Sequence, residues 1–139
     1  MYFTSDREFT TRLYELDLKT GKSRPLWNRD EDIIRVSVSP DGKNLAFWVS
    51  GKEGGLYVLP LDGGEARRVV KLPGSQFRGN GGGDYAWSPD MKWIAYSAKS
   101  ESRAFNIFVV RASGGEPVNV TRLYTGFALI CGVHRRQLA

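Results

Sequence analysis

One hairpin signature occurs twice in the chain, and this repeat restricts the possible folds more than any other feature. Residues 36–48 and residues 85–97 each contain an alternating apolar run, a Ser-Pro-Asp turn and a second alternating run. Alternation at a period of two on both sides of turn residues predicts two antiparallel strands joined by a tight turn. The two copies begin about 50 residues apart, which indicates a structural repeat.

Two more strands are predicted after each hairpin, so that each repeat becomes a four-stranded unit. Strands are expected at 34–38, 44–49, 56–61 and 65–70, and then at 85–87, 93–97, 106–111 and 117–121. Residues 2–5, 12–18 and 23–27 predict a shorter, three-stranded unit. Its last strand contains Pro25, which cannot donate to a ladder and is expected at a sheet edge. Within 12–18, alternation predicts that Tyr14, Leu16 and Leu18 point inward and Leu13 outward.

A four-stranded antiparallel unit that recurs at this interval is typical of a β-propeller blade. The predicted fold is therefore all-β, a partial propeller of about two and a half blades, and its ring is not closed because closed propellers have about four to eight blades. The expected division is an incomplete blade at 1–30, a full blade at 31–72, a full blade at 73–126 that starts with a long glycine-rich loop, and an aberrant start of the next blade at 127–139.

The residues of the Ser-Pro-Asp and Gly-Gly segments are predicted to shape turns. Proline presets φ, aspartate binds nearby backbone amides, and glycine tolerates positive φ. The turn residues are Ser39, Pro40, Asp41, Gly42, Ser88, Pro89, Asp90, Gly63, Gly64, Gly114 and Gly115. Met91 stands where the first copy has glycine, so the second turn is expected to be type I, without positive φ at this position.

A catalytic role for the same residues is disfavoured. Asp41 and Asp90 resemble a carboxylate pair, but they occupy the same turn position in two different blades, which favours backbone capping. Ser39 and Ser88 lack the Gly-x-Ser-x-Gly setting of a nucleophile and have no histidine partner in the pattern. The sequence therefore predicts no catalytic, cofactor-binding or metal-binding residues, and no cofactor.

Other segments leave two interpretations each. The side chains of Phe47, Trp48, Trp87 and Trp93 could form a stacking surface for carbohydrate or peptide, but alternation with small residues favours packing between sheets. Residues 72–84 are a lengthened surface loop or a phosphate cradle, and the cradle is disfavoured because the glycines precede a strand. Residues 119–121 match a glycosylation sequon, but they fall in a predicted strand. From about Leu129 the tail departs from the repeat, through true divergence or a frameshift.

Composition excludes several classes of function. The net charge of +5 comes from basic residues scattered singly or in pairs, so no nucleic-acid partner is expected. The single cysteine, Cys131, excludes an internal disulfide framework and a cysteine-based zinc site, and the single histidine, His134, lies in the unusual tail and gives no basis for a catalytic triad. No apolar run is long enough for a membrane-spanning helix, and the first residues are not a signal peptide but resemble the middle of a strand. The chain is thus expected to start inside a larger protein, with a cytoplasmic or periplasmic location left open.

The repeated turns also resemble a known family. The Trp87-Ser-Pro-Asp turn, its sister at 38–42, the hairpins at 62–65 and 113–117, and the segment at 2–7 resemble TolB-like, WD-repeat-like propeller blades. Such blades occur in TolB, in prolyl-oligopeptidase-type enzymes and in tricorn-type proteases. Residues 84–97 are most similar to the propeller region of tricorn-like serine peptidases.

This resemblance implies a function without catalysis in these residues. The chain would be a propeller segment of a larger tricorn-like serine peptidase that routes or filters peptide substrates and mediates protein interaction. Its partners would be peptides or proteins and the rest of the parent polypeptide. The alternatives are a TolB-type protein-binding scaffold with no enzymatic role and the propeller of a prolyl-oligopeptidase-type enzyme.

Overall fold

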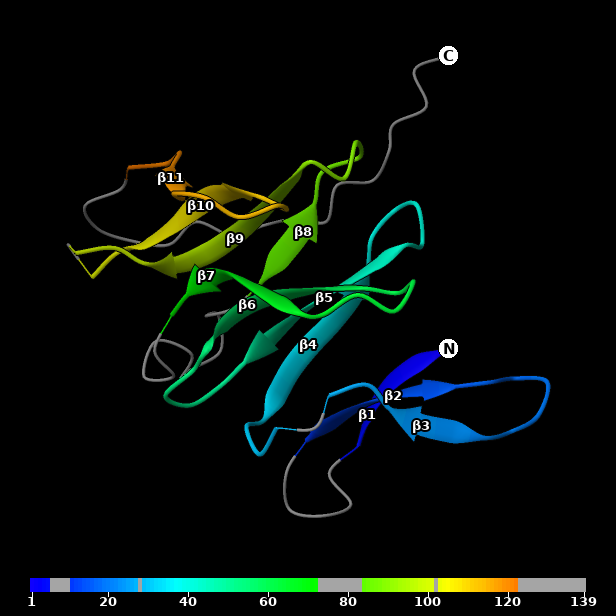
Figure 1. The fold of residues 1–139 in the computed structure, drawn as a ribbon. Helices are drawn as coiled ribbons and strands as arrows, with labels where there is room; N and C mark the ends of the chain where they lie inside the picture. Colours follow the sequence, from blue (N-terminus) through cyan, green and yellow to red (C-terminus); the bar gives the residue numbers. More distant parts are fainter. Residues whose placement is uncertain (6–10, 28, 73–83, 102, 123–139) are drawn as a thin grey trace.

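The computed structural model describes residues 1–5, 11–27, 29–72, 84–101 and 103–122, and every regular element in them is a β-strand. The strands form three antiparallel sheets in which sequence neighbours are also neighbours in space. Figure 1 shows the sheets one after another, with the first at the lower right and the third at the top. The described part contains no helix that is long and apolar enough to cross a membrane. The all-β prediction and the unclosed arrangement of sheets are confirmed.

The first sheet has three strands in the order β1-β2-β3, which are β1 (Tyr2–Ser5), β2 (Arg12–Leu16) and β3 (Ser23–Pro25). As predicted, Pro25 lies in an edge strand. The predicted facing of β2 is wrong, because Leu13 is fully buried and Leu18 is 73% exposed. The strand ends at Leu16, which leaves Leu18 in the following hairpin turn, and the second sheet covers the face of β2 that carries Leu13.

The second sheet lies between the other two and has the order β4-β5-β6-β7. Its strands are β4 (Ile33–Val38), β5 (Asn44–Val49), β6 (Gly55–Pro60) and β7 (Arg67–Lys71). Almost every side chain of β5 and β6 is buried, because both faces of this sheet are covered. Alternation along β5 sends Phe47 into the core shared with the first sheet and Trp48 into the core shared with the third.

Aromatic rings fill both cores. Trp27, after β3, lies 5.1 Å edge-on from the rings of both Phe47 and Tyr57, which joins the first sheet to the second. On the other side, Trp48 meets Tyr96 edge-on at 5.8 Å. Such edge-to-face pairs add about 0.5–1.5 kcal/mol beyond the area they bury.

The third sheet repeats the meander in the order β8-β9-β10-β11. Its strands are β8 (Tyr85–Trp87), β9 (Trp93–Lys99), β10 (Phe105–Arg111) and β11 (Val118–Asn119). The last strand is shorter than the predicted 117–121. Beyond its end, the side chain of Thr121 forms hydrogen bonds to β10. Its hydroxyl accepts a bond from the Ile107 amide at 3.0 Å and donates to Oδ1 of the buried Asn106 at 2.9 Å.

A bulge and a close strand approach shape the second sheet. The register of β4 shifts between Ile34 and Val36, and Arg35 at the shift has a φ of 55°. At the start of β6, Gly55 allows β7 to come close, since a Cβ there would lie 2.0 Å from the Val70 carbonyl oxygen. The bulge leaves Arg35 without a register partner on β5.

Candidate functional site

The first Ser-Pro-Asp turn is closed by its own side chains. The Ser39 hydroxyl donates to Asp41 Oδ1 at 2.5 Å and accepts a bond from the Asn44 amide at 3.0 Å. The Lys43 amide donates to the same Asp41 oxygen at 3.1 Å. The Ser39 hydroxyl, followed by the Lys43 amide, lowers the pKa of Asp41. Both side chains are therefore engaged in holding the β4–β5 hairpin.

The second turn has the same bonds with different residues around it. The Ser88 hydroxyl donates to Asp90 Oδ1 at 2.5 Å and accepts from the Trp93 amide at 3.0 Å. The pKa of Asp90 is lowered by the Ser88 hydroxyl and the Lys92 amide. Met91 has a φ of 59°, close to the 73° of Gly42, so the predicted absence of positive φ in this turn is wrong. The common bond pattern imposes the left-handed conformation even on a methionine.

The predicted proline and glycine residues also lie in turns. Pro40 and Pro89 are exposed residues in the second position of each Ser-Pro-Asp segment. In the later hairpins Gly63 and Gly114 have positive φ values of 102° and 97°. Gly115 also has positive φ, and the Gly64 amide donates to Asp62 Oδ1 at 3.4 Å. The structure spreads the predicted turn residues over separate hairpins, so they do not form one shared reaction centre.

Three of the four aromatic side chains weighed as a stacking surface are inside the protein. Phe47 and Trp48 are fully buried and Trp87 is 8% exposed. Trp93 is the exception, because it is only partly buried and lies under the Arg111 guanidinium at 4.7 Å. Packing is therefore the role of the first three, and Trp93 has a cation–π partner at the surface.

Polar contacts that the sequence did not predict join the second sheet to the third. The Tyr85 hydroxyl, on β8, donates to the Ala46 carbonyl of β5 at 2.6 Å, and burial raises its pKa to about 12. The Arg35 guanidinium at the β4 bulge meets the Asp84 carboxylate at 2.6 Å. No local motif marks these residues, because each depends on where the neighbouring sheet lies.

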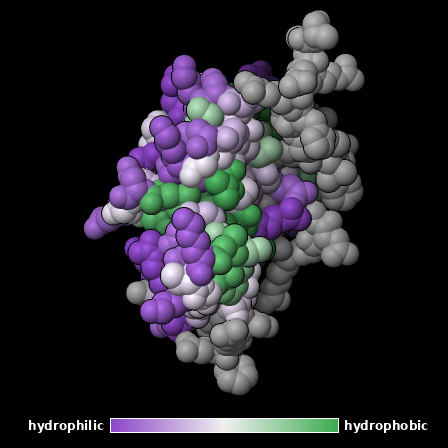
Figure 2. Space-filling model, turned by 90° about the vertical axis from the view of Figure 1, so that its right-hand side faces the viewer, coloured by the Kyte–Doolittle hydropathy of each residue, from purple (hydrophilic) through white to green (hydrophobic). Residues whose placement is uncertain are grey.

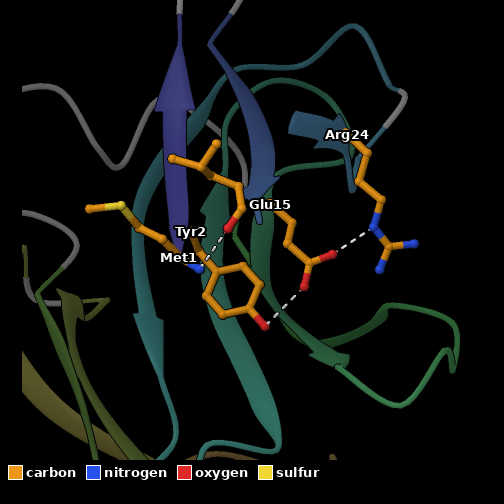
Figure 3. A network of polar contacts seen from close by, with 5 residues as sticks. Met1, Tyr2, Glu15 and Arg24 are labelled. Atoms are coloured by element: carbon orange, nitrogen blue, oxygen red, sulfur yellow. Dashed lines mark hydrogen bonds and ion pairs between the residues drawn. The ribbon is translucent and has the colours of Figure 1, made fainter. Parts of the chain in front are cut away.

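A network on the first sheet is shown in Figure 3. Glu15 on β2 accepts from the Tyr2 hydroxyl at 3.5 Å and from Arg24 Nε at 2.6 Å, while the Met1 amino group donates to the Leu16 carbonyl at 3.0 Å. Burial and then the charge of Glu15 raise the pKa of Tyr2. The network ties the three strands of the first sheet together.

A hollow of about 820 Å³ adjoins this network and is lined by Met1 and the β2–β3 hairpin. Acidic and basic side chains both line it, among them Glu15, Asp17, Lys19 and Lys22. Mixed charge gives this hollow no electrostatic selectivity for an anion or a cation.

A smaller cleft of about 270 Å³ lies where the second and third sheets meet. It is lined by Asn44, Val58, Arg67, Trp87, Met91, Lys92, Arg111, Ala112 and Ser113. In contrast to the first hollow, its charged side chains are all basic. The Arg67 guanidinium spans the cleft by donating to the Ala112 carbonyl at 3.3 Å.

Apolar side chains are also gathered at the surface. Figure 2 shows hydrophobic residues in the middle of the face that lies on the right in Figure 1, with hydrophilic residues around them. Exposed large apolar residues of the described part include Met1, Leu18, Ile34 and Val38. A surface of this kind suits contact with other protein more than catalysis.

Metal chemistry has no candidate in the described ranges, where no group of three or more His, Cys, Asp or Glu side chains could hold an ion.

The predictions for the loop at 73–83, for Cys131 and His134, and for the tail from Leu129 lie outside the described residues.

Comparison with known proteins agrees with the geometry. No family model matches the chain. Over 85 residues it is 34% identical to the uncharacterized peptidase YuxL of Bacillus subtilis strain 168, a match that covers 59% of this chain and 12% of that protein. Among solved structures, it matches TolB from Acinetobacter baumannii with a TM-score of 0.59 and 21% identity, over 84% of this chain and 28% of that one. It matches a candidate TolB from Agrobacterium tumefaciens with a TM-score of 0.66 and 23% identity, over 88% and 42%.

The three meandering sheets and these neighbours define the class, which is an unclosed β-propeller of the TolB-like fold. Within that class, the chain has a weak sequence similarity to a peptidase. It spans less than half the length of each of these three proteins.

Proposed function

We propose that the chain is a non-catalytic β-propeller segment of a larger tricorn-like serine peptidase. The observation that carries this proposal is the 34% identity over 85 residues to a protein named as a peptidase, in a region that makes up 12% of that protein. A match to so small a part fits a propeller segment that accompanies a separate catalytic region.

The turn geometry supports the absence of a catalytic role for these residues. Ser39 and Ser88 each donate to an aspartate in their own turn, and the part of the chain that the structure describes contains no histidine to accept the proton that a serine nucleophile must lose. The two aspartates are held by backbone amides and by these hydroxyls, so they serve the hairpins.

The proposed role is to route or filter peptide substrates and to mediate protein contacts. Blades of a closed ring surround a channel that admits an extended peptide and excludes a folded protein. The exposed apolar residues in Figure 2 and the basic cleft between sheets supply surfaces for peptide and protein partners. The rest of the parent polypeptide is the first such partner, and nucleic acid is not among them.

The coding sequence beyond residue 139 tests the proposal directly. A PDZ-like region followed by a serine-protease region supports a tricorn-like parent, and a Gly-x-Ser-x-Gly hydrolase domain supports a prolyl-oligopeptidase-type parent instead. In parallel, the chain is incubated with a fluorogenic peptide library, and no cleavage is expected. Turnover that disappears on Ser39→Ala or Ser88→Ala would overturn the non-catalytic role.

A TolB-type binding scaffold is the second candidate, favoured by the fold match to TolB structures with TM-scores of 0.59 and 0.66. In this case the propeller face docks protein partners and no enzyme is attached. A stop codon soon after residue 139, or further blades without any hydrolase region, would favour the scaffold over the peptidase.

A further inference from the structure

The cleft between the second and third sheets has the chemistry of a binding site for an acidic side chain. Three cationic residues line it, namely Arg67 at the start of β7, Lys92 in the second Ser-Pro-Asp hairpin and Arg111 at the end of β10. None of the three forms an ion pair with a carboxylate in the described part of the chain. Asp90 immediately precedes the lining residues Met91 and Lys92. Its Oδ1 accepts hydrogen bonds from the Ser88 hydroxyl and the Lys92 amide inside the turn.

One of these cations is held in place before any ligand arrives. The Arg67 guanidinium bonds to the Ala112 carbonyl at 3.3 Å, whereas the Arg111 guanidinium lies 4.7 Å from the ring of Trp93, which does not line the cleft. A planar guanidinium that is already oriented loses less freedom when it binds a carboxylate, and it can do so through two parallel bonds. Lys92 adds a mobile point charge at the same place.

The walls of the cleft decide which kind of anion fits. Val58, Trp87, Met91 and Ala112 give the cleft apolar walls beside Arg67 and Lys92, and Asn44 and Ser113 add neutral polar groups. A phosphate ion has no apolar part to place against such walls. A glutamate or aspartate side chain has both a carboxylate and an aliphatic stem, and a cleft of about 270 Å³ has room for one.

We propose that this cleft binds an acidic side chain of a peptide or protein segment. The inference rests on the proposed role in peptide binding and names the site and the residue chemistry for it. The site is formed by two sheets together, so it exists only where consecutive sheets are packed.

The test measures binding of a short peptide by fluorescence anisotropy with the full 139-residue chain. The probe has two glutamates, an uncharged dye and blocked ends, and a matched peptide has glutamines in their place. The glutamate peptide is expected to bind at least about tenfold more tightly than the glutamine peptide, because charge-assisted bonds are lost in the latter. Equal binding of the two peptides would overturn the proposal.

Variants locate the site. The double change Arg67→Gln and Lys92→Gln is expected to weaken binding of the glutamate peptide at least about tenfold, with far-ultraviolet circular dichroism confirming the fold. The control, Lys19→Gln with Lys22→Gln, removes the same charge beside the mixed-charge hollow and is expected to change binding less than about threefold. Equal losses in both double variants would show non-specific attraction and overturn the proposal. Unchanged binding in the first variant would overturn it too, while peptide binding elsewhere on the propeller would stand.

Inorganic phosphate distinguishes the two sources of negative charge. At matched ionic strength, phosphate is expected to displace the peptide no better than chloride does. Displacement by phosphate at much lower concentrations would make the cleft a general oxyanion site and would overturn its assignment to an acidic side chain.

Discussion

At the scale of single residues, backbone conformation is set by the hydrogen bonds of the turn and less by residue preference. Gly42 and Met91 occupy the same turn position with φ values of 73° and 59°. The sequence predicts a type I turn at Met91 because most side chains disfavour positive φ. The paired Ser–Asp bonds and the amide bonds around them are the same in both turns, and they outweigh the local cost of about 1–2 kcal/mol.

Gly42→Ala is expected to destabilise the chain by about 1 kcal/mol, because alanine must adopt the left-handed region. A Cβ at this position would meet nothing within 4 Å, so the cost is conformational and not steric. Gly42→Asn is the matched control and should cost less, since asparagine tolerates this region. Urea denaturation gives both values, and equal stability of Gly42→Ala and the parent chain would contradict the argument.

At the scale of elements, the hairpins depend on ionised aspartates. The pKa of Asp41 is lowered by the Ser39 hydroxyl and the Lys43 amide, so folding favours the charged form. This contribution is fully present well above the ordinary pKa of 3.8, and it is lost as pH falls through the lower pKa of the folded state.

Asp41→Asn is therefore expected to reduce the loss of stability between about pH 5 and pH 2. Urea midpoints measured across this range for the parent chain and the variant give the slopes to compare. Asp62→Asn, in the turn between β6 and β7, removes one carboxylate from the same sheet and provides the control. Parallel curves for the parent chain and Asp41→Asn would show that the turn carboxylate is not linked to folding.

How far the elements could be predicted depends on whether their signal is local. Turn residues at fixed positions and period-two alternation are local, and strands β4 to β10 were expected within about two residues of where they lie. The burial of Leu13 depends on which face of β2 the second sheet covers, and alternation alone does not mark that face. The β4 bulge at Arg35 and the cleft at Arg67 depend on the neighbouring sheet, which no local pattern encodes.

At the scale of the whole molecule, the packing of sheets is reinforced by a few specific contacts. Tyr85→Phe removes the 2.6 Å bond to the Ala46 carbonyl and is expected to cost about 1 kcal/mol at neutral pH. Burial raises the pKa of Tyr85 to about 12, so the folded state keeps a proton that the unfolded chain loses above pH 10. The contribution is present below pH 10 and is lost as pH rises towards 12.

Thermal unfolding of the parent chain and Tyr85→Phe at pH 7 and at several values from pH 9 to about pH 11 measures both effects. The variant should lose less stability than the parent chain over the alkaline range. Tyr14→Phe, on the first sheet, is the control and should follow the parent chain. If Tyr85→Phe lost as much stability at alkaline pH as the parent chain, the proton linked to folding would belong to another group.

The outer faces of the first and third sheets carry apolar side chains without a described neighbouring sheet. On the first sheet, Phe3 stacks on Tyr14 at 5.3 Å, on the face opposite the buried Leu13. On β10, Ile107 and Val109 alternate with the inward Phe108 and Val110 and are only partly buried. In a stack of repeated units, each such face is covered by the next unit. The outer faces of the first and third sheets are therefore expected to bind other protein surfaces.

The chain is therefore expected to self-associate. Its weight-average sedimentation coefficient should rise as the protein concentration is raised from about 5 to about 200 µM, because exposed apolar surface drives association in this range. Val109→Lys places a charge on the outer face of the third sheet and should shift the chain towards monomer. Thr4→Lys, at an exposed position on β1, adds the same charge as a control and should change association less. A chain that stays monomeric at every concentration and melts in a sharp, concentration-independent transition would show that these faces are stable in contact with water.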